Sequence, residues 1–283
     1  MEKSEHLSEL AKISKLIGQN PAYVQGGGGN TSVKFGDKYM AVKSSGLTLA
    51  EVTESNGYSV VDFEAINLYL MNSDEDENLF TQRIRSFVVG VNNRPSIETG
   101  FHALLGIYVI HTHSVYVNIL TCSVEGKEIL IELFPDSFWI KYKTPGKELT
   151  SEIRTNLKDS KAESGVIFLQ NHGLIVWAKT ASLAFNLHED ICNKIRNNIN
   201  TTDFNLDKET DQVLDIKYSK ILFPDQVIYT MAGEDILATQ GAKETIYSYS
   251  YILSNIKKNF LTPSFLPTKE SRKLLEMESE KFR

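Results

Sequence analysis

Val-Ile-His-Thr-His-Ser, residues 109–114, is an apolar run that ends in two histidines one residue apart. Residues i and i+2 of an extended segment point to the same face, because side chains alternate across a strand. His111 and His113 can therefore share one metal ion. A second motif, Phe-Leu-Gln-Asn-His-Gly at 168–173, offers His172 at the end of another predicted strand. Three imidazoles with one open position are typical of a catalytic zinc, whereas a structural zinc usually has four ligands.

The composition narrows the class of protein. The chain has 283 residues, of which 41% are hydrophobic and 23% are charged, as in ordinary globular proteins. A net charge of −6 argues against a nucleic-acid or anionic-membrane partner, which would need a basic surface. No run approaches the roughly 18 apolar residues of a membrane span, and the N-terminus lacks the pattern of a secretory signal. Cys122 and Cys192 do not form a disulfide framework or a metal-binding spacing. We therefore expect a cytoplasmic protein.

Hydrophobic periodicity predicts helices and strands that interleave along the chain. The predicted helices are 5–17, 62–71, 97–106, 113–122, 149–157 and 180–198, and the predicted strands are 33–35, 39–42, 107–111, 166–169 and 174–178. This alternation predicts a layered α/β fold. Residues 72–78 are predicted to form a polar loop.

A polar stretch at 200–207 marks the predicted boundary between a catalytic domain, 1–200, and a C-terminal extension, 201–283, packed on it. Within the extension, the pattern predicts a strand at 226–229 and helices at about 241–258 and 268–282.

Three polar elements are candidates for binding an anion. Four consecutive glycines at 26–29 precede Asn30-Thr31-Ser32. The backbone N–H groups of such a loop can form a concave nest for an anion, although a flexible turn is the simpler interpretation of a glycine run alone. The segment Lys43-Ser44-Ser45-Gly46 and the residue Ser96 could add further amides and hydroxyls to a phosphate site.

Glu98 and His102 are four residues apart and can share one helical face. A carboxylate beside a zinc site can be a ligand, a general base or a solvated helix residue. Because the strand with the two histidines follows, we weigh a functional role for Glu98 equally with a solvated one. His102 is predicted to pack or hydrogen-bond near the site. His6 and His188 are predicted to be solvated, because acidic residues neighbour both.

A set of motifs in a fixed order resembles the class II aldolase/adducin family over roughly residues 5–200. The motifs are Gly-Gly-Asn-Thr-Ser (28–32), Ser-Ser-Gly (44–46), Ser-Ile-Glu-Thr-Gly-Phe-His (96–102), Ile-His-Thr-His-Ser (110–114), Thr-Pro-Gly-Lys-Glu-Leu (144–149) and Gln-Asn-His-Gly-Leu (170–174). Relatives in this family include fuculose- and rhamnulose-phosphate aldolases and ribulose-phosphate 4-epimerase. With Phe-Pro-Asp-Gln-Val-Ile-Tyr at 223–229, the long form also resembles the aldolase half of rhamnulose-phosphate aldolase/dehydrogenase fusions.

The resemblance implies a fold and a set of roles. The implied fold is a central, mainly antiparallel sheet between helices. His111, His113 and His172 match ligands of Zn²⁺ or another divalent transition metal, and Glu98 matches the acid/base carboxylate. The positions that match the phosphate site are Gly29, Asn30, Ser45, Gly46 and Ser96. The aldolases often have two serines before the glutamate, and here Ile97 replaces the second, which removes one hydroxyl from the phosphate site.

These roles predict a zinc-dependent lyase that performs reversible aldol cleavage of a phosphorylated ketose through an enediolate. An epimerase, dehydratase or decarboxylase of a sugar or sugar-acid derivative could use the same zinc site. A non-catalytic, adducin-like binding module is the third hypothesis, and the presence of all three histidines and Glu98 argues against it. The resemblance further implies a homotetramer and a sugar phosphate as the small-molecule partner, with no nucleic acid and no membrane.

Overall fold

A single mixed sheet forms the centre of the protein. The computed structural model describes residues 2–72, 76–90, 93–158, 162–206, 220–231 and 239–279. Within them, seven strands pair in the order β3-β2-β1-β4-β7-β6-β5, and only β5 and β6 are parallel. The strands are β1 (Asn30–Phe35), β2 (Tyr39–Lys43), β3 (Tyr58–Asp62), β4 (Tyr108–Thr112), β5 (Phe138–Ile140), β6 (Gly165–Leu169) and β7 (Gly173–Ala178). The predicted α/β class with a mainly antiparallel sheet is confirmed.

The strand with the paired histidines lies in the middle of this sheet. β4 is bonded to β1 on one side and to β7 on the other, and His111 pairs with Asn30 and Ile175. Successive side chains of β4 alternate between faces, so Ile110 joins one hydrophobic cluster and Val109 joins another. His111 shares the face of Val109. The register of three strands therefore fixes the position of His111.

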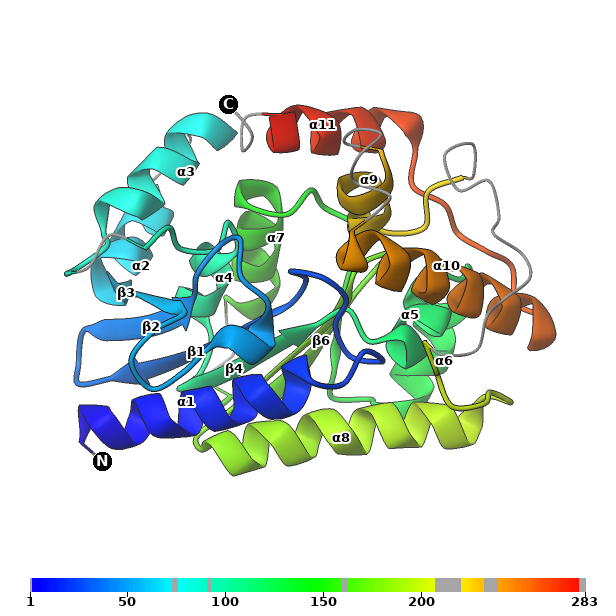
Figure 1. The fold of residues 1–283 in the computed structure, drawn as a ribbon, viewed down its shortest axis with the longest axis horizontal. Coiled ribbons are helices and arrows are strands. Elements are labelled where there is room, and N and C mark those ends of the chain that lie inside the picture. The colour runs from blue at the N-terminus through cyan, green and yellow to red at the C-terminus, as the bar shows by residue number, and fades with distance from the viewer. Residues whose placement is uncertain are drawn as a thin grey trace.

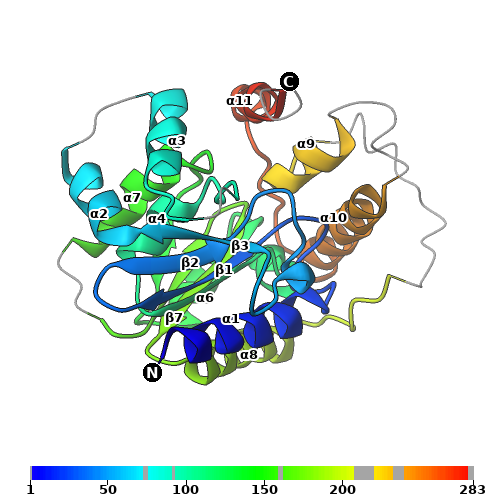
Figure 2. The same ribbon diagram turned by 60° about the vertical axis from the view of Figure 1, so that its left-hand side comes forward.

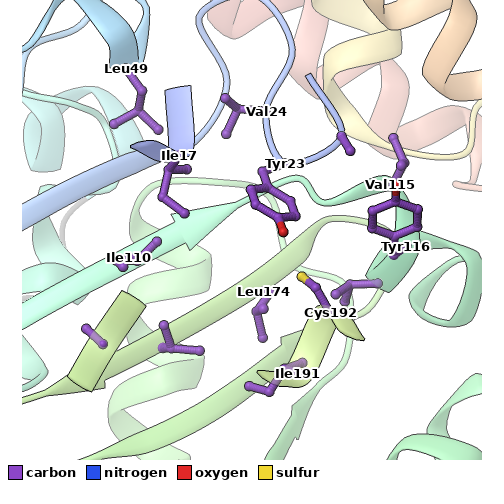
Figure 3. Packing of buried hydrophobic residues seen from close by; sticks show 14 of the residues in the cluster. Ile17, Tyr23, Val24, Leu49, Ile110, Val115, Tyr116, Leu174, Ile191 and Cys192 are labelled. Atoms are coloured by element: carbon purple, nitrogen blue, oxygen red, sulfur yellow. The ribbon is translucent and has the colours of Figure 1, made fainter. Parts of the chain in front are cut away.

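Two long helices cover one face of the sheet. They are α1 (Lys3–Gly18) and α8 (Ala181–Asn198), which lie side by side beneath the strands in Figures 1 and 2. Helix α1 buries an apolar stripe at helical spacing that includes Leu10, Ile13 and Ile17. Figure 3 shows Ile17, Ile110 and Leu174 in this core. Burial of each such side chain contributes about 1.5–3 kcal/mol, so this layer holds β4 firmly.

Shorter helices cover the opposite face (Figure 2). They are α2 (Phe63–Asn72), α3 (Glu77–Ser86), α4 (Thr99–Leu104) and α7 (Lys147–Leu157). Phe101 on α4 packs with Leu149 and Ile153 on α7 against the face of Val109. The helix α4 thus lies on the same side of the sheet as His111, and its N-terminal end brings Glu98 with it.

The remaining elements surround one end of the sheet. They are η1 (Leu49–Glu51), α5 (Val115–Thr121), α6 (Gly126–Leu133), α9 (Pro224–Thr230), α10 (Gln240–Lys258) and α11 (Thr268–Ser279). Helix α10 contacts α5 and α9, and α11 contacts α9. Leu222, Phe223 and Ile252 belong to the same hydrophobic cluster as Ile110. The division of the chain into two domains near residue 200 stays a prediction. No helix in the described ranges is long and apolar enough to cross a membrane.

Two local predictions were wrong. Residues 226–229 belong to helix α9 and do not form a strand. Pro224 occupies the first turn of α9, where a missing N–H costs nothing, and Asp225 follows it. His188 is fully buried: its Nε2 lies 2.9 Å from Thr112 Oγ1, and the ring of Tyr23 packs edge-on against it.

Other predictions held in part. His6 is half-buried and hydrogen-bonds through Nδ1 to the Tyr108 hydroxyl at 2.8 Å. A loop was predicted at 72–78, but α2 ends at Asn72 and α3 already begins at Glu77. Residues 73–75 of that loop lie outside the described ranges, as do residues 280–282 of the last predicted helix. Strands β3 and β5 and helices α3 and α6 had no counterpart in the prediction.

Candidate active site

The structure brings the three predicted metal ligands together. His111 is on β4, His113 follows it directly, and His172 lies in the turn between β6 and β7. All three are buried, and one ligand nitrogen from each lies within 4.8 Å of the others. The Nε2 atoms of His111 and His113 are 3.1 Å apart. Nitrogens that share a zinc at 2.0–2.1 Å are about 3.3 Å apart in a tetrahedral arrangement, so this cluster has the size of a metal site.

Glu98 lies against the same cluster. Its Oε2 is 3.4 Å from His111 Nε2, and its Oε1 is 3.5 Å from His172 Nε2. The Oε1 atom is buried and has no hydrogen-bond partner among the described residues. A buried carboxylate oxygen without a partner is costly unless something else satisfies it. The three imidazoles and this orphan oxygen therefore fit a divalent metal.

Hydrogen bonds at the far side of two rings hold their Nε2 atoms toward the cluster. His111 Nδ1 donates to the carbonyl of Leu174 at 3.0 Å. His113 Nδ1 donates to Asp225 Oδ2 at 2.5 Å. With the proton on Nδ1, each Nε2 carries a free lone pair, as metal-binding histidines require. Residues of the described chain provide no hydrogen-bond partner for His172 Nδ1.

A second chain of hydrogen bonds holds Glu98. Asn30 Nδ2 donates to Glu98 Oε2 at 2.7 Å, and Asn30 Oδ1 accepts from His102 Nε2. The other ring nitrogen of His102 bonds to Ser32 Oγ at 2.7 Å. His102 therefore hydrogen-bonds beside the site, as predicted. Asn30, predicted to face a phosphate, has both ends of its amide engaged within the protein.

Burial and charge set the protonation of these groups. Burial lowers the pKa of His111 and, further, that of His172, so both are neutral near pH 7. Burial also opposes a proton on His113, but the charge and hydrogen bond of Asp225 outweigh it and raise the pKa of His113. Burial favours the protonated form of Glu98, yet the surrounding imidazoles and Asn30 lower its pKa. Glu98 is thus an ionised carboxylate beside imidazoles that can bind a metal.

The cluster opens into a cleft with a cavity volume of about 620 Å³, a size suited to a small molecule. Every residue predicted to hold the phosphate lines this cleft: Gly29, Asn30, Ser45, Gly46 and Ser96. Two cationic side chains, Lys43 and Arg94, also line it. Burial lowers the pKa of Lys43 to about 8, and its Nζ donates to the Gly27 carbonyl at 3.0 Å. Arg94 Nε is buried without a hydrogen-bond partner in the described chain.

Sequence reasoning named Lys43 only as part of a polar segment and assigned no site role to Arg94, Asp225 or Tyr229, which also line the cleft. Lys43 belongs to the polar segment 43–46 and Arg94 lies two residues before Ser96, so the charge of these two side chains was the available signal. Asp225 and Tyr229 lie in helix α9, more than 100 residues from His113 along the chain. Local patterns carry no information about a contact of that separation.

The fold thus brings together three buried imidazoles and an adjacent carboxylate in a group that is compatible with a divalent metal. The chain belongs to the class II aldolase and adducin N-terminal domain family, whose model matches residues 8–196. The resemblance inferred from the ordered motifs is thereby confirmed.

Three similar proteins illustrate this membership. The "uncharacterized oxidoreductase YuxG" of Bacillus subtilis is 30% identical over 190 residues, which cover 63% of this chain and 27% of YuxG. The chain thus spans about a quarter of that protein's length. Methylthioribulose-1-phosphate dehydratase of Bacillus pumilus is 25% identical, over 65% of this chain and 86% of the dehydratase. An N-terminal class II aldolase domain from Thermoplasma acidophilum superposes with a TM-score of 0.60 at 25% identity, over 67% of this chain and 91% of that domain.

Proposed function

We propose that the protein is a zinc-dependent lyase that cleaves a phosphorylated ketose by a reversible aldol reaction. The observation that carries the proposal is the convergence of the Nε2 atoms of His111, His113 and His172 with the Glu98 carboxylate at the base of a cleft. The cleft also presents hydroxyls and two cations. Family membership supports the same assignment.

The three histidines would hold the metal. Neutral nitrogen donors suit Zn²⁺, and a set of three leaves room for a substrate. When bound, such an ion supplies Lewis-acid stabilisation of negative charge that develops on a substrate oxygen. The hydrogen bonds from Nδ1 of His111 and His113 keep their Nε2 lone pairs available for it.

Glu98 is proposed to move the proton. In aldol cleavage, the hydroxyl on the departing carbon loses its proton, the carbon–carbon bond breaks, and the remaining carbon takes up a proton. Glu98 is ionised, and its Oε1 has no partner in the described chain. Asn30 holds Oε2 and thereby orients the carboxylate. General acid–base catalysis of this kind contributes on the order of 10²–10⁴ in rate.

An anionic end of the substrate is proposed to lie between the two cations of the cleft. Ser45 and Ser96 supply hydroxyls and Gly46 a backbone amide, while Lys43 and Arg94 add charge. Binding energy at this remote group would orient the reacting carbons over Glu98. The guanidinium of Arg94 can take the place of the hydroxyl that is lost at Ile97, which also lines the cleft.

Dehydration of a phosphorylated ketose is the second candidate, because the chain is similar over 65% of its length to a methylthioribulose-1-phosphate dehydratase. In that reaction, a proton leaves the carbon beside the carbonyl, and the hydroxyl on the next carbon departs as water. The same carboxylate and the same metal ligands would serve. The two reactions differ in whether a carbon–carbon or a carbon–oxygen bond breaks.

A product analysis separates the two reactions. The Zn²⁺-loaded protein is incubated with a panel of phosphorylated ketoses, with a hydrazine to trap aldehydes. Aldol cleavage yields a trapped aldehyde and a smaller ketone phosphate, whereas dehydration yields one product lighter by a water. Glu98→Gln serves as the inactive control. A panel that returns neither product, at full zinc occupancy, contradicts both candidates and leaves the epimerase and decarboxylase alternatives and the non-catalytic binding module.

The assembly and location are also proposals. By analogy with the family, we propose a homotetramer that acts in the cytoplasm. Light scattering at assay concentration tests the assembly, and a fully active monomer would refute it.

A further inference from the structure

Asp225 reaches the site from a part of the chain that the family model does not include, since that match ends at residue 196. It is the second residue of α9 and is 4% exposed. Its Oδ2 lies 2.5 Å from Nδ1 of His113, on the side of the ring opposite the metal-facing Nε2. A buried carboxylate that accepts the Nδ1 proton fixes both the tautomer and the orientation of an imidazole.

We propose that Asp225 is a positioning residue that sets the metal affinity of the site through His113, so that helix α9 is part of the metal centre. The proposal rests on the metal site proposed above. Asp225 itself contacts the imidazole and is not assigned as a ligand.

Other contacts of the C-terminal segment point to the same part of the molecule. The Tyr229 hydroxyl, also on α9, accepts a hydrogen bond from the Gly27 amide at 2.7 Å. Glu244 Oε2 on α10 accepts from the Gly26 amide at 2.8 Å. Helices α9 and α10 therefore hold the glycine loop that borders the cleft.

The second histidine motif is held from the same segment. Asn171, which precedes His172, donates from Nδ2 to the Leu222 carbonyl at 2.8 Å and to the Ser264 carbonyl at 2.6 Å. Asn171 has a left-handed φ of 54°, which asparagine tolerates better than most residues. Residues after 220 thus touch both histidine motifs and the glycine loop.

A purely structural role for Asp225 makes a different prediction. An acidic residue in the first turn of a helix also stabilises the helix dipole. Loss of that interaction would lower the melting temperature of the metal-free protein and leave the metal affinity of the folded protein unchanged. If Asp225 acts through His113, its loss should instead lower the metal affinity of the folded protein, because the carboxylate holds the ring that faces the metal.

The test measures Zn²⁺ affinity of the full chain by competition with a chromogenic chelator. Asp225→Asn is expected to weaken Zn²⁺ binding by about 10–100-fold, the range found for such supporting carboxylates. Asp225→Glu should recover part of the loss. Asp190→Asn, an exposed residue of α8, is the matched control for the lost charge and should bind as the unaltered protein does. Circular dichroism of each metal-free variant verifies that it is folded.

A second readout requires no metal. Long-range ¹H–¹⁵N correlation spectra of the metal-free protein should show the proton of His113 on Nδ1, and Asp225→Asn should shift the ring toward a mixture of tautomers. The visible spectrum of Co²⁺-loaded Asp225→Asn should have the same band intensity as that of the Co²⁺-loaded unaltered protein, because the number of ligands does not change. A change to the band intensity of a different coordination number would make Asp225 a ligand and overturn the positioning role.

The outcomes separate the two proposals. Equal Zn²⁺ affinity in Asp225→Asn and in the unaltered protein overturns the positioning role and leaves the proposed lyase intact. An unaltered protein that binds no divalent metal refutes the proposed function. If no metal binds, the tautomer spectrum of His113 still tests the role of Asp225. Identical His113 spectra in Asp225→Asn and in the unaltered protein would overturn the positioning role as well.

Discussion

Replacement of Gly28 by alanine should weaken metal binding, although Gly28 belongs to a loop and contacts no metal. Its φ lies outside the left-handed region, so the backbone accepts alanine. A Cβ atom at this position would lie 2.7 Å from Asp225 Oδ2 and 2.8 Å from His113 Nδ1. The new methyl group would therefore press on the hydrogen bond that holds His113.

The size of the effect follows from these distances. Carbon makes ordinary contacts with such atoms at 3.4 Å or more, so each partner must move by about 0.6–0.7 Å if the loop does not move. If the pair separates, the 2.5 Å bond is lost, at a cost of about 1.5–3 kcal/mol for a hydrogen bond to a charged group. If the pair moves together, His113 is displaced by more than the roughly 0.5 Å that a preorganised site tolerates. We expect Zn²⁺ affinity to fall by about 10–150-fold.

The assay is the chelator competition used for Asp225, applied to the full chain. Gly27→Ala is the matched control, because a Cβ there would meet the Tyr229 hydroxyl at 2.8 Å and neither His113 nor Asp225. Its Zn²⁺ affinity should stay within about twofold of the unaltered protein, well below the tenfold that 1.4 kcal/mol produces. Gly28→Ala with unaltered affinity would show that the contact between Asp225 and His113 does not govern the site.

Four further predictions concern the cluster itself. Glu98→Gln should keep the bound metal, measured by elemental analysis, and lose about 10²–10⁴ in turnover, because an amide cannot accept the proton; normal turnover would exclude Glu98 from the chemistry. Simultaneous replacement of His111, His113 and His172 by alanine should abolish metal binding, and stoichiometric metal in that variant would place the site elsewhere. Free Zn²⁺ at 100 times its Kd should add about 2.7 kcal/mol of stability, or about 5–10 °C in melting temperature, that a chelator removes; calorimetry that shows no such shift contradicts a site formed by folding. Asp225 raises the pKa of His113 above its ordinary value of about 6.5, and protons compete with the metal for Nε2 of that ring. As the pH is lowered, Zn²⁺ affinity should therefore start to fall before pH 6.5 is reached. A Zn²⁺ affinity that does not change between pH 8 and pH 5 would contradict this.

The histidine pair was predictable because its geometry is local. A strand has a side-chain period of two, and that period alone places His111 and His113 on one side. His172 could be proposed from its own strand-end motif and Glu98 from its position before the strand, but only the ordered set of motifs assigned both of them to the same site as the pair. Their distances from the pair depend on the register of β4 with β7 and on the packing of α4, neither of which a local pattern encodes.

The errors have identifiable physical causes. Val227 and Ile228 favour a strand by propensity, but that preference is weak and depends on context. Pro224 in the first helical turn and the acidic Asp225 were the helix signals in the same segment. At His188, the acidic neighbours suggested solvent, whereas the spacing with Ala184 and other buried residues of α8 marks it as part of the buried face.

The site combines a residue of the central strand with a residue of a short helix, two kinds of element that generally unfold at different free energies. The His111 amide lies in the central strand of the sheet, hydrogen-bonded on both sides, and such amides exchange with solvent mostly through global unfolding. Helix α9 has seven residues, fewer than the roughly 12–15 that a helix needs to persist without packing partners. Its opening requires only loss of its docking contacts. If α9 undocked, the carboxylate that orients His113 would leave with it, so loss of the docking contacts of one short helix would weaken the proposed metal site while the central sheet stays folded.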